Sequence, residues 1–260
     1  MVSRHPVTLI ALKFPTVKPG EKLSRVVTKC LQSQGLGPRR GDILAVASKI
    51  VSTCEHRVVK LSDVRLTPRS RCLARRWSID DRLAALVANE ADEIVGGVTG
   101  FLLTIKNGIL TPNAGIDVKN SPPGSATLWP VNPDRSARIL RRSLERRYRT
   151  RIGIEIVDSR VTALRLGTVG LAIGLSGFCP VLDHRGVHDI FGRPIKVTQS
   201  NLADDIASAA HLLMGESAEL IGGVIIRGAG IDMNPTATGR RVRLSRERCL
   251  IGGSLIQHEA

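Results

Sequence analysis

Apolar residues recur along the chain with two different spacings, and clusters of Gly, Pro, Asn and Ser separate one segment from the next. Short apolar runs predict strands over residues 7–12, 42–47, 57–61, 101–105, 109–111, 126–130, 152–157, 167–178 and 224–227. Helical spacing predicts a helix at 23–31 that stops near Gly35, one opened by Ser78 and Asp81 as a capping box, one that begins at Asn132-Pro133, and one over 202–214. The glycines of 167–178 indicate a strand against which other backbone packs closely.

One hairpin has a specific turn signal. Lys106-Asn107-Gly108 joins two predicted strands, and Asn-Gly is a pair that type I′ hairpin turns favour. Elsewhere strands and helices do not alternate regularly, so the pattern favours an α+β fold with mixed or antiparallel sheets and flanking helices over a doubly wound sheet. We expect a single domain over residues 1–260, divisible into two subdomains, with a basic, weakly patterned tail from about residue 229.

Composition is that of a globular protein. Of the 260 residues 42% are hydrophobic but only 3% are aromatic, so the core must consist mainly of aliphatic side chains. No apolar stretch approaches the ~18 residues that indicate a membrane span. Residues 1–6 lack the apolar segment of a signal peptide, so we expect a cytoplasmic protein with no membrane partner. The five cysteines are scattered without a C-x-x-C pair, which argues against a zinc ribbon or a disulfide scaffold.

The net charge of +15 favours an anionic ligand. Basic residues gather at 69–76, 135–151 and 240–248, and nucleic-acid binding is one hypothesis for them, since phosphate contacts supply affinity without sequence demands. The middle cluster, however, has the spacing of an amphipathic helix whose arginines face solvent, and neither a zinc finger nor an aromatic RNA-binding motif accompanies it. A field that attracts small anionic substrates is therefore favoured over nucleic acid.

Three acids stand where an apolar run gives way to small or polar residues: Asp117 in Asn-Ala-Gly-Ile-Asp, Asp158 in Val-Asp-Ser-Arg and Glu216 in Leu-Met-Gly-Glu-Ser. Acids at the mouth of a core can hold one or two hard divalent cations, whose ligands are carboxylate and phosphate oxygens. Ser159 offers one more oxygen beside Asp158. The phosphate loop, the dinucleotide fingerprint and the nucleophile elbow are missing from the sequence, so metal ions would have to do much of the work of binding phosphate.

Simpler roles remain open for these acids. Asp117 can close a turn through its own backbone. Glu216 lies just past the predicted helix 202–214, where the helix dipole disfavours an anion, and it is either a cation ligand or a solvated side chain. Asp204 and Asp205 fall in the first turn of that helix, where acids are expected, and are taken as structural.

A series of segments carries a family resemblance over most of the chain, from Val7 to about Gly228. In order, the segments are Gly41-Asp42-Ile43-Leu44, Ser48-Lys49-Ile50-Val51-Ser52, Asn113-Ala114-Gly115-Ile116-Asp117, Asp158-Ser159, Gly167-Thr168-Val169-Gly170-Leu171-Ala172-Ile173-Gly174, Asp189-Ile190-Phe191-Gly192-Arg193-Pro194, Ala203-Asp204-Asp205 and Leu212-Leu213-Met214-Gly215-Glu216. Together they resemble the coenzyme F420-0:L-glutamate ligase family, the γ-glutamyl ligases that extend the tail of a deazaflavin coenzyme.

The resemblance implies a GTP-dependent ligase that requires a divalent metal, Mg²⁺ or Mn²⁺, with K⁺ as a further candidate. By the family's pattern Asp117, Asp158, Ser159 and Glu216 hold the metals, and the three acids among them are the expected catalytic residues. The nucleotide is expected to contact Leu12, Lys13, Phe14, Pro15, Ser48, Lys49, Thr53, Asn120, Met214, Gly215, Ser217, Ala218, Glu219, Leu220 and Ile221. The family fold is an α+β arrangement of its own kind, assembled as an intertwined homodimer.

The implied reaction joins L-glutamate to the terminal carboxylate of the anionic precursor F420-0. A carboxylate does not react with an amine at neutral pH because its leaving group would be oxide, whereas phosphorylation by GTP gives an acyl phosphate that the amine can attack. Such a transfer needs positioning by metals rather than a covalent nucleophile. Arg165, Arg193 and Arg227 are candidates to hold the anionic substrate, with surface or structural roles as the alternative.

Two departures from the family's pattern are visible. Residues 160–164 stand where well-known members continue with an aromatic residue or Asn and then Gly-Arg. Thr53 stands where some members place a Lys at the nucleotide, for which Lys49 is a possible substitute. Two further hypotheses are therefore kept: the same ligase chemistry with another anionic acceptor, and a basic nucleic-acid-binding protein on a ligase-like scaffold.

Overall fold

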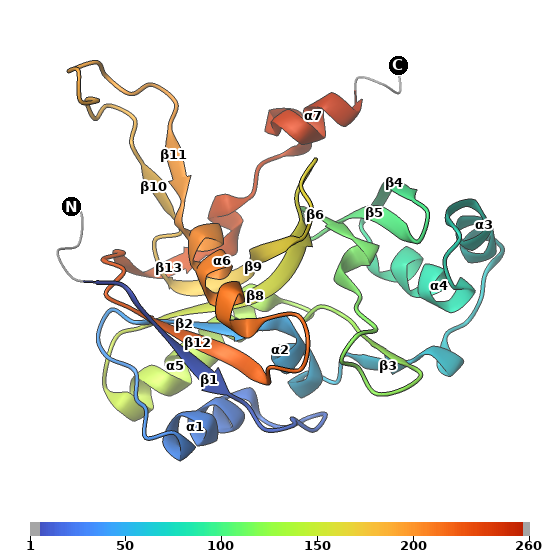
Figure 1. The fold of residues 1–260 in the computed structure, drawn as a ribbon, viewed down its shortest axis with the longest axis horizontal. Coiled ribbons are helices and arrows are strands. Elements are labelled where there is room, and N and C mark those ends of the chain that lie inside the picture. The colour runs from blue at the N-terminus through green and yellow to red at the C-terminus, as the bar shows by residue number, and fades with distance from the viewer. Residues whose placement is uncertain (1–5, 257–260) are drawn as a thin grey trace.

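A six-stranded mixed sheet forms the centre of the computed structural model, which describes residues 6–256 (Figure 1). Its strand order is β1-β12-β2-β8-β9-β13, and only β2 and β8 run parallel. The strands are β1 (Thr8–Lys13), β2 (Ile43–Ala47), β8 (Gly153–Val161), β9 (Thr168–Phe178), β12 (Ile221–Arg227) and β13 (Met233–Thr238). The predicted α+β class with mixed and antiparallel sheets is confirmed. The segment after residue 229 is not a weakly patterned tail throughout, because β13 within it pairs with β9 at the edge of this sheet.

Helices cover both faces of the central sheet. On one face lie α1 (Leu23–Ser33) and α5 (Pro133–Tyr148), whose aliphatic side chains share a core with the sheet. On the other face α6 (Leu202–Met214) packs through its alanines and Ile206. Asn132 caps α5 as predicted, since its side chain accepts a hydrogen bond from the N–H of Arg135.

The glycines of β9 allow both helices to approach its backbone. A Cβ at Gly170 would lie 2.1 Å from the carbonyl oxygen of Ala207 in α6, and a Cβ at Gly174 would lie 2.4 Å from Cβ of Pro133 in α5. Side chains at these positions would push the helices away from the sheet. The close packing predicted for residues 167–178 is therefore confirmed.

A second, smaller layer packs around its own aliphatic cluster at the right of Figure 1. Its elements are the sheet β4 (Glu93–Val98), β5 (Phe101–Lys106) and β6 (Ile109–Pro112), and the helices α3 (Pro68–Trp77) and α4 (Asp81–Glu90). The Asn107-Gly108 hairpin is confirmed, with φ of 52° and 72° at the two turn residues.

The predicted cap of α4 is wrong by two residues. Ser78 ends α3, a helix that the sequence pattern did not reveal, and adopts the left-handed conformation there with φ of 53°. A residue in that conformation terminates a helix and does not start one. Asp80 caps α4 instead, since its side chain accepts the N–H groups of Arg82 and Leu83.

Short elements complete the described chain. They are α2 (Ser48–Cys54), the pair β3 (Val58–Lys60) and β7 (Ser125–Thr127), the pair β10 (Val181–Asp183) and β11 (Gln199–Asn201), and α7 (Leu250–Ile256). The β10–β11 pair forms the base of an arm that projects from the body of the molecule (Figure 1). No helix in residues 6–256 combines the length and the apolar character that crossing a membrane requires. The expectation for the N-terminal residues 1–5 lies outside the described part of the chain.

Glu155 is an acid enclosed by the core. It lies on β8 with 0% exposure, and neither of its carboxyl oxygens has a hydrogen-bond partner in the described part of the chain. Burial, with a further contribution from the charge of Asp204, raises the pKa of Glu155 well above its ordinary value. Folding therefore favours the protonated form of Glu155 relative to the unfolded chain.

Glu155→Gln is expected to flatten the dependence of stability on pH. Because the pKa of Glu155 is raised in the folded state, its contribution to wild-type stability is fully present below the unfolded pKa of 4.5 and is lost as pH rises toward the folded value. This one proton contributes at most about 1.4 kcal/mol per pH unit. Urea unfolding of both proteins between pH 5 and 8 measures the difference. Parallel curves would contradict the assignment, and Asp205→Asn, at an exposed acid of α6, is the control.

Candidate functional site

The strand pairings bring four segments to one edge of the central sheet. Because β2 and β8 are parallel and Ala47 pairs with Val157, Ser48 and Lys49 at the start of α2 follow β2 next to Asp158 and Ser159. The antiparallel neighbours place the start of β12 and the end of β1 at the same edge. A cleft of about 600 Å³ lies here, and it extends to the loop around Asp117.

Most of the predicted site residues line this cleft. Asp117, Asp158, Ser159 and Glu216 all border it. The predicted nucleotide contacts that border it are Phe14, Pro15, Ser48, Lys49, Thr53, Asn120, Met214, Gly215, Ser217, Ala218, Glu219, Leu220 and Ile221. Two others do not: Leu12 is fully buried in the core, and Lys13 is exposed at the end of β1.

Asp117 is presented by a strained turn. Asn113, Ala114 and Gly115 all have positive φ, at 49°, 54° and 70°. Buried hydrogen bonds to β5 hold this turn: the N–H of Leu102 donates to the Asn113 side chain at 2.9 Å, and the N–H of Ala114 donates to the Thr104 hydroxyl at 2.8 Å. Such backbone persists only where surrounding structure enforces it, which is common at functional sites.

The Asp117 carboxylate has two different partners. One oxygen accepts the N–H of Lys119 at 2.7 Å, which is the turn-closing role expected of an aspartate. The other oxygen accepts a hydrogen bond from Nζ of Lys49 at 2.7 Å, and the same ammonium donates to the carbonyl of Lys119 at 2.7 Å. Asp117 therefore closes its own turn with one oxygen and pairs with the Lys49 ammonium across the cleft with the other.

Asp158 is held by donors from two elements. Its carboxylate accepts hydrogen bonds from the indole N–H of Trp129 and the hydroxyl of Ser48. Burial raises the pKa of Asp158, although these donors, the N–H of Ser159 and the charge of Lys49 each favour the ionised form. A cation beside this carboxylate would add to the same stabilisation of its ionised form.

Glu216 lies beyond α6, as expected, but it is not simply solvated. Its carboxylate accepts hydrogen bonds from the hydroxyl of Thr168 and from His211, both at 2.9 Å, and from Ser159. Although burial acts to raise it, these donors hold the pKa of Glu216 below its ordinary value. Nζ of Lys119 lies 3.8 Å from its second oxygen.

The candidate ligand atoms of the cleft suit a hard cation, because they are carboxylate and hydroxyl oxygens. In residues 6–256, however, no three His, Cys, Asp or Glu side chains form a group that could hold an ion as they stand. Each acid has hydrogen-bond donors instead. Asp117 accepts from Lys49, and Asp158 accepts from Trp129 and Ser48. Glu216 accepts from His211 and Thr168. A cation entering the cleft would therefore compete with donors, chiefly Lys49, for these oxygens.

Two loops close the cleft. The Asn120 side-chain amide donates to the carbonyl of Ser217 at 2.9 Å, which joins the loop after Asp117 to the loop after α6. Gly215 has φ of 68° and ψ of −174°, and a Cβ there would lie 2.3 Å from the Glu219 carboxyl carbon. Only glycine fits this bend, so Gly215 lets the loop after α6 fold back on itself.

Several partners of the three acids were not predicted from the sequence. Trp129, His211 and Lys119 each contact one of the acids and belong to none of the family segments, whereas Thr168 lies in such a segment but was given no role. Of the arginines proposed for substrate, Arg227 is paired with Asp42 at 2.7 Å and Arg193 with Asp189 at 3.0 Å. Those two contacts give both arginines structural partners, whereas Arg165 is exposed.

Comparison with known proteins assigns a class to this fold and cleft. The profile of a ligase family matches residues 11–228, so ligase is the class of protein. The family is described as F420-0:Gamma-glutamyl ligase, and the chain belongs to it.

Similar proteins include three that carry the name coenzyme F420:L-glutamate ligase. That of Methanopyrus kandleri is 36% identical over 228 residues, which cover 87% of this chain and 88% of the relative. That of Methanocaldococcus jannaschii is 34% identical over 229 residues, with coverage of 88% and 90%. That of Methanococcus maripaludis is 33% identical over 248 residues, with coverage of 95% and 98%. The likeness therefore extends over nearly the whole length of both chains.

Proposed function

We propose that the protein is a GTP-dependent ligase that joins L-glutamate to the terminal carboxylate of the F420-0 precursor. The observation that carries this proposal is the convergence of Asp117, Asp158, Ser159 and Glu216 on one cleft, together with most of the expected nucleotide-facing residues. Membership of the ligase family supports the same reaction. The departure at residues 160–164 leaves another anionic carboxylate as the alternative acceptor.

The reaction proceeds in two steps. An acceptor carboxylate oxygen attacks the γ-phosphorus of GTP, the bond from that phosphorus to the β–γ bridging oxygen breaks, and GDP leaves. The amine of L-glutamate then attacks the acyl carbon of the acyl phosphate, the carbon–oxygen bond breaks, inorganic phosphate leaves and the amine loses a proton. Both steps bring anions together, so the site must supply positive charge and alignment.

Residues of the cleft provide that charge and alignment. Lys49, held by the Lys119 carbonyl, presents an ammonium to a phosphate group. Trp129 and Ser48 fix the orientation of Asp158, and Ser159 fixes that of Glu216. A Mg²⁺ or Mn²⁺ ion held by Asp117, Asp158, Ser159 and Glu216 would neutralise the phosphates and the acceptor carboxylate. K⁺ is kept as a candidate monovalent ion.

Mass spectrometry of a complete reaction tests the proposal. The protein is incubated with GTP, MgCl₂ or MnCl₂, KCl or NaCl, L-glutamate and F420-0. We expect a product heavier by one or more glutamyl residues and an equal amount of GDP per bond formed. GDP without a glutamylated product would indicate another acceptor. If neither GTP nor ATP is consumed under any metal, the ligase assignment to this chain is wrong.

A homodimer is also part of the proposal, with the arm between β10 and β11 as its contact. Ile190 and Phe191 near the tip of the arm are 92% and 74% exposed, an unusual exposure for such large apolar side chains. In Figure 1 the arm lies well clear of the body, so a second copy has access to both of its faces.

Ile190→Asp combined with Phe191→Asp is expected to convert the dimer to a monomer. Two charges in an apolar contact cost several kcal/mol because they must be desolvated without partners. Light scattering coupled to size-exclusion chromatography measures the mass, with Val98→Asp, at an exposed valine of the smaller sheet, as the control. A wild-type protein that is monomeric, or a variant that stays dimeric, would contradict this contact.

A further inference from the structure

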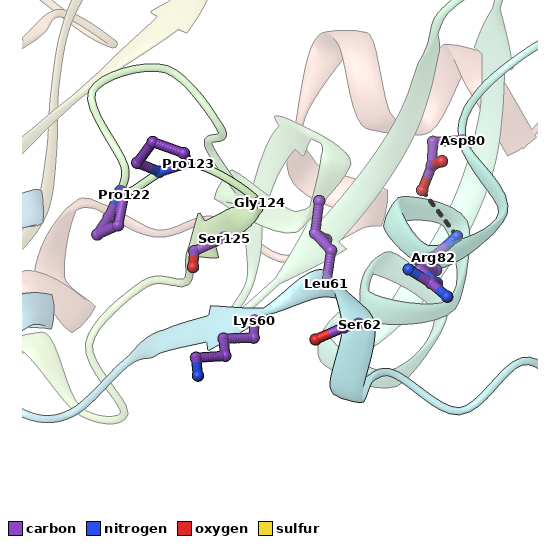
Figure 2. Close-up of a pocket in the computed structure, with 9 residues that line it drawn as sticks. All are labelled: Lys60, Leu61, Ser62, Asp80, Arg82, Pro122, Pro123, Gly124 and Ser125. Carbon is purple, nitrogen blue, oxygen red and sulfur yellow. Dashed lines mark hydrogen bonds between the residues drawn. The ribbon is translucent and has the colours of Figure 1, made fainter.

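A second cavity lies on the other side of the loop that closes the cleft. Its volume is about 510 Å³, and it is bordered by β3, the turn after it, the start of α4 and residues 122–125. Figure 2 shows the Lys60–Ser62 segment facing the loop with Pro122 and Pro123, and Asp80 and Arg82 at the far side of the space. Neither the sequence motifs nor the proposed reaction uses these residues.

The charges of this cavity are unbalanced. Lys60 and Arg82 supply two cations, and within the described chain neither has an ion pair with an acid. The single acid, Asp80, already accepts the N–H groups of Arg82 and Leu83 as the cap of α4. Two cations without acidic partners at the border of a cavity attract an anion, and a carboxylate is a suitable partner for both ammonium and guanidinium groups.

The cavity and the cleft are separated by the thickness of one loop. Pro122 borders both spaces. On β3, Val58 borders the cleft and Lys60 borders the cavity, and residues two apart on a strand share a face about 7 Å apart.

Hydrogen bonds hold this wall in place. The N–H of Leu61 donates to the carbonyl of Gly124 at 2.8 Å, and Asn120 is tied to Ser217 at 2.9 Å. A substrate long enough to cross this one loop would reach both spaces.

We propose that this cavity is an anion subsite for the glutamyl tail of an acceptor that has already been extended. This inference rests on the proposed function. Each ligation consumes one carboxylate and adds a glutamate that carries two, so the tail gains one negative charge per residue. The non-reacting carboxylates of the tail then lie on the coenzyme side of the reacting terminal carboxylate, where Lys60 and Arg82 pair with them. The subsite would favour addition of glutamate to acceptors that already carry a tail.

The test compares the double variant Lys60→Gln/Arg82→Gln with wild type. Isothermal titration with a γ-linked triglutamate peptide is expected to show at least about tenfold weaker binding in the variant, as for the loss of charge-assisted contacts. The KM for an acceptor bearing one glutamyl residue should rise by a similar factor, while kcat and the KM for F420-0 stay unchanged. Arg69→Gln, at an exposed arginine of α3, is the control for a change of overall charge. The single variant Lys60→Arg keeps the positive charge and should bind the peptide as wild type does.

The outcomes separate this inference from the proposed function. Peptide binding that depends on Lys60 and Arg82 in a protein that fails to ligate would support the subsite and reject the ligase assignment. Active ligation with equal peptide binding and equal elongation in wild type and double variant would reject the subsite alone. Equal loss of binding in Arg69→Gln would also reject it, because the effect would then be one of overall charge.

Discussion

Asp158→Asn is expected to lower kcat for glutamylation by about a thousandfold, because an amide keeps the shape of the side chain but removes the charge that would hold a cation against the phosphates. The carboxylate of Asp158 is held by two hydrogen-bond donors, Trp129 and Ser48. Its oxygen can still accept from Trp129 after the change, so the fold should persist.

Two measurements test the prediction for Asp158→Asn. Steady-state kinetics reports kcat, and electron paramagnetic resonance of Mn²⁺ reports metal binding without any need for turnover. We expect both to be impaired in Asp158→Asn and neither in Asp205→Asn, which changes an exposed acid on α6. An Asp158→Asn protein with normal kcat and normal Mn²⁺ binding would remove Asp158 from the metal site.

Gly115→Ala is expected to destabilise the fold by about 2–5 kcal/mol, as the sum of left-handed backbone strain and overpacking of a buried indole. Gly115 has φ of 70°, and a Cβ there would lie 2.1 Å from the Trp129 ring. Trp129 is 2% exposed and packed in the main core, so it has little room to retreat. Because Trp129 also holds Asp158, activity should fall more than the loss of folded protein explains.

Gly124→Ala separates the backbone strain from the overpacking of the Trp129 indole. Gly124 has φ of 71°, nearly the same as Gly115, but nothing lies within 4 Å of the position of its Cβ. Urea unfolding should therefore show a loss of about 1–2 kcal/mol for Gly124→Ala, the backbone strain alone. Equal losses of unfolding free energy in the two variants would show that the close contact between position 115 and Trp129 adds nothing to the backbone strain.

Local sequence patterns predicted the elements that contain a residue type required by the local conformation or packing. The β9 glycines, the Asn107-Gly108 turn and the cap at Asn132 were found because each places a residue where its conformation or size is required. Helix α3 was missed because its apolar positions are few among arginines. Strand β13 was missed because Asn234 and Pro235, residues that strands disfavour, lie within it, and its partner β9 supplies the pairing.

The site was predictable in its acids but not in its contacts. Asp117, Asp158 and Glu216 stand at the ends of apolar segments and carry the family's motifs, so the sequence predicted them as site residues, and the structure places all three at the cleft. Their partners come from elsewhere: Trp129 lies 29 residues from Asp158, and Thr168 lies 48 residues from Glu216. Such pairs follow from the order of strands in the sheet, which local spacing does not encode.

In the proposed reaction the acceptor carboxylate is phosphorylated before the amine of L-glutamate attacks it. The most direct measurement uses an acceptor whose terminal carboxylate is labelled with ¹⁸O, incubated with GTP, Mg²⁺ and L-glutamate. Mass spectrometry of the released phosphate should show one ¹⁸O atom for each amide bond formed, because the carboxylate oxygen leaves as part of the phosphate. Amide formation with unlabelled phosphate would contradict the acyl phosphate route.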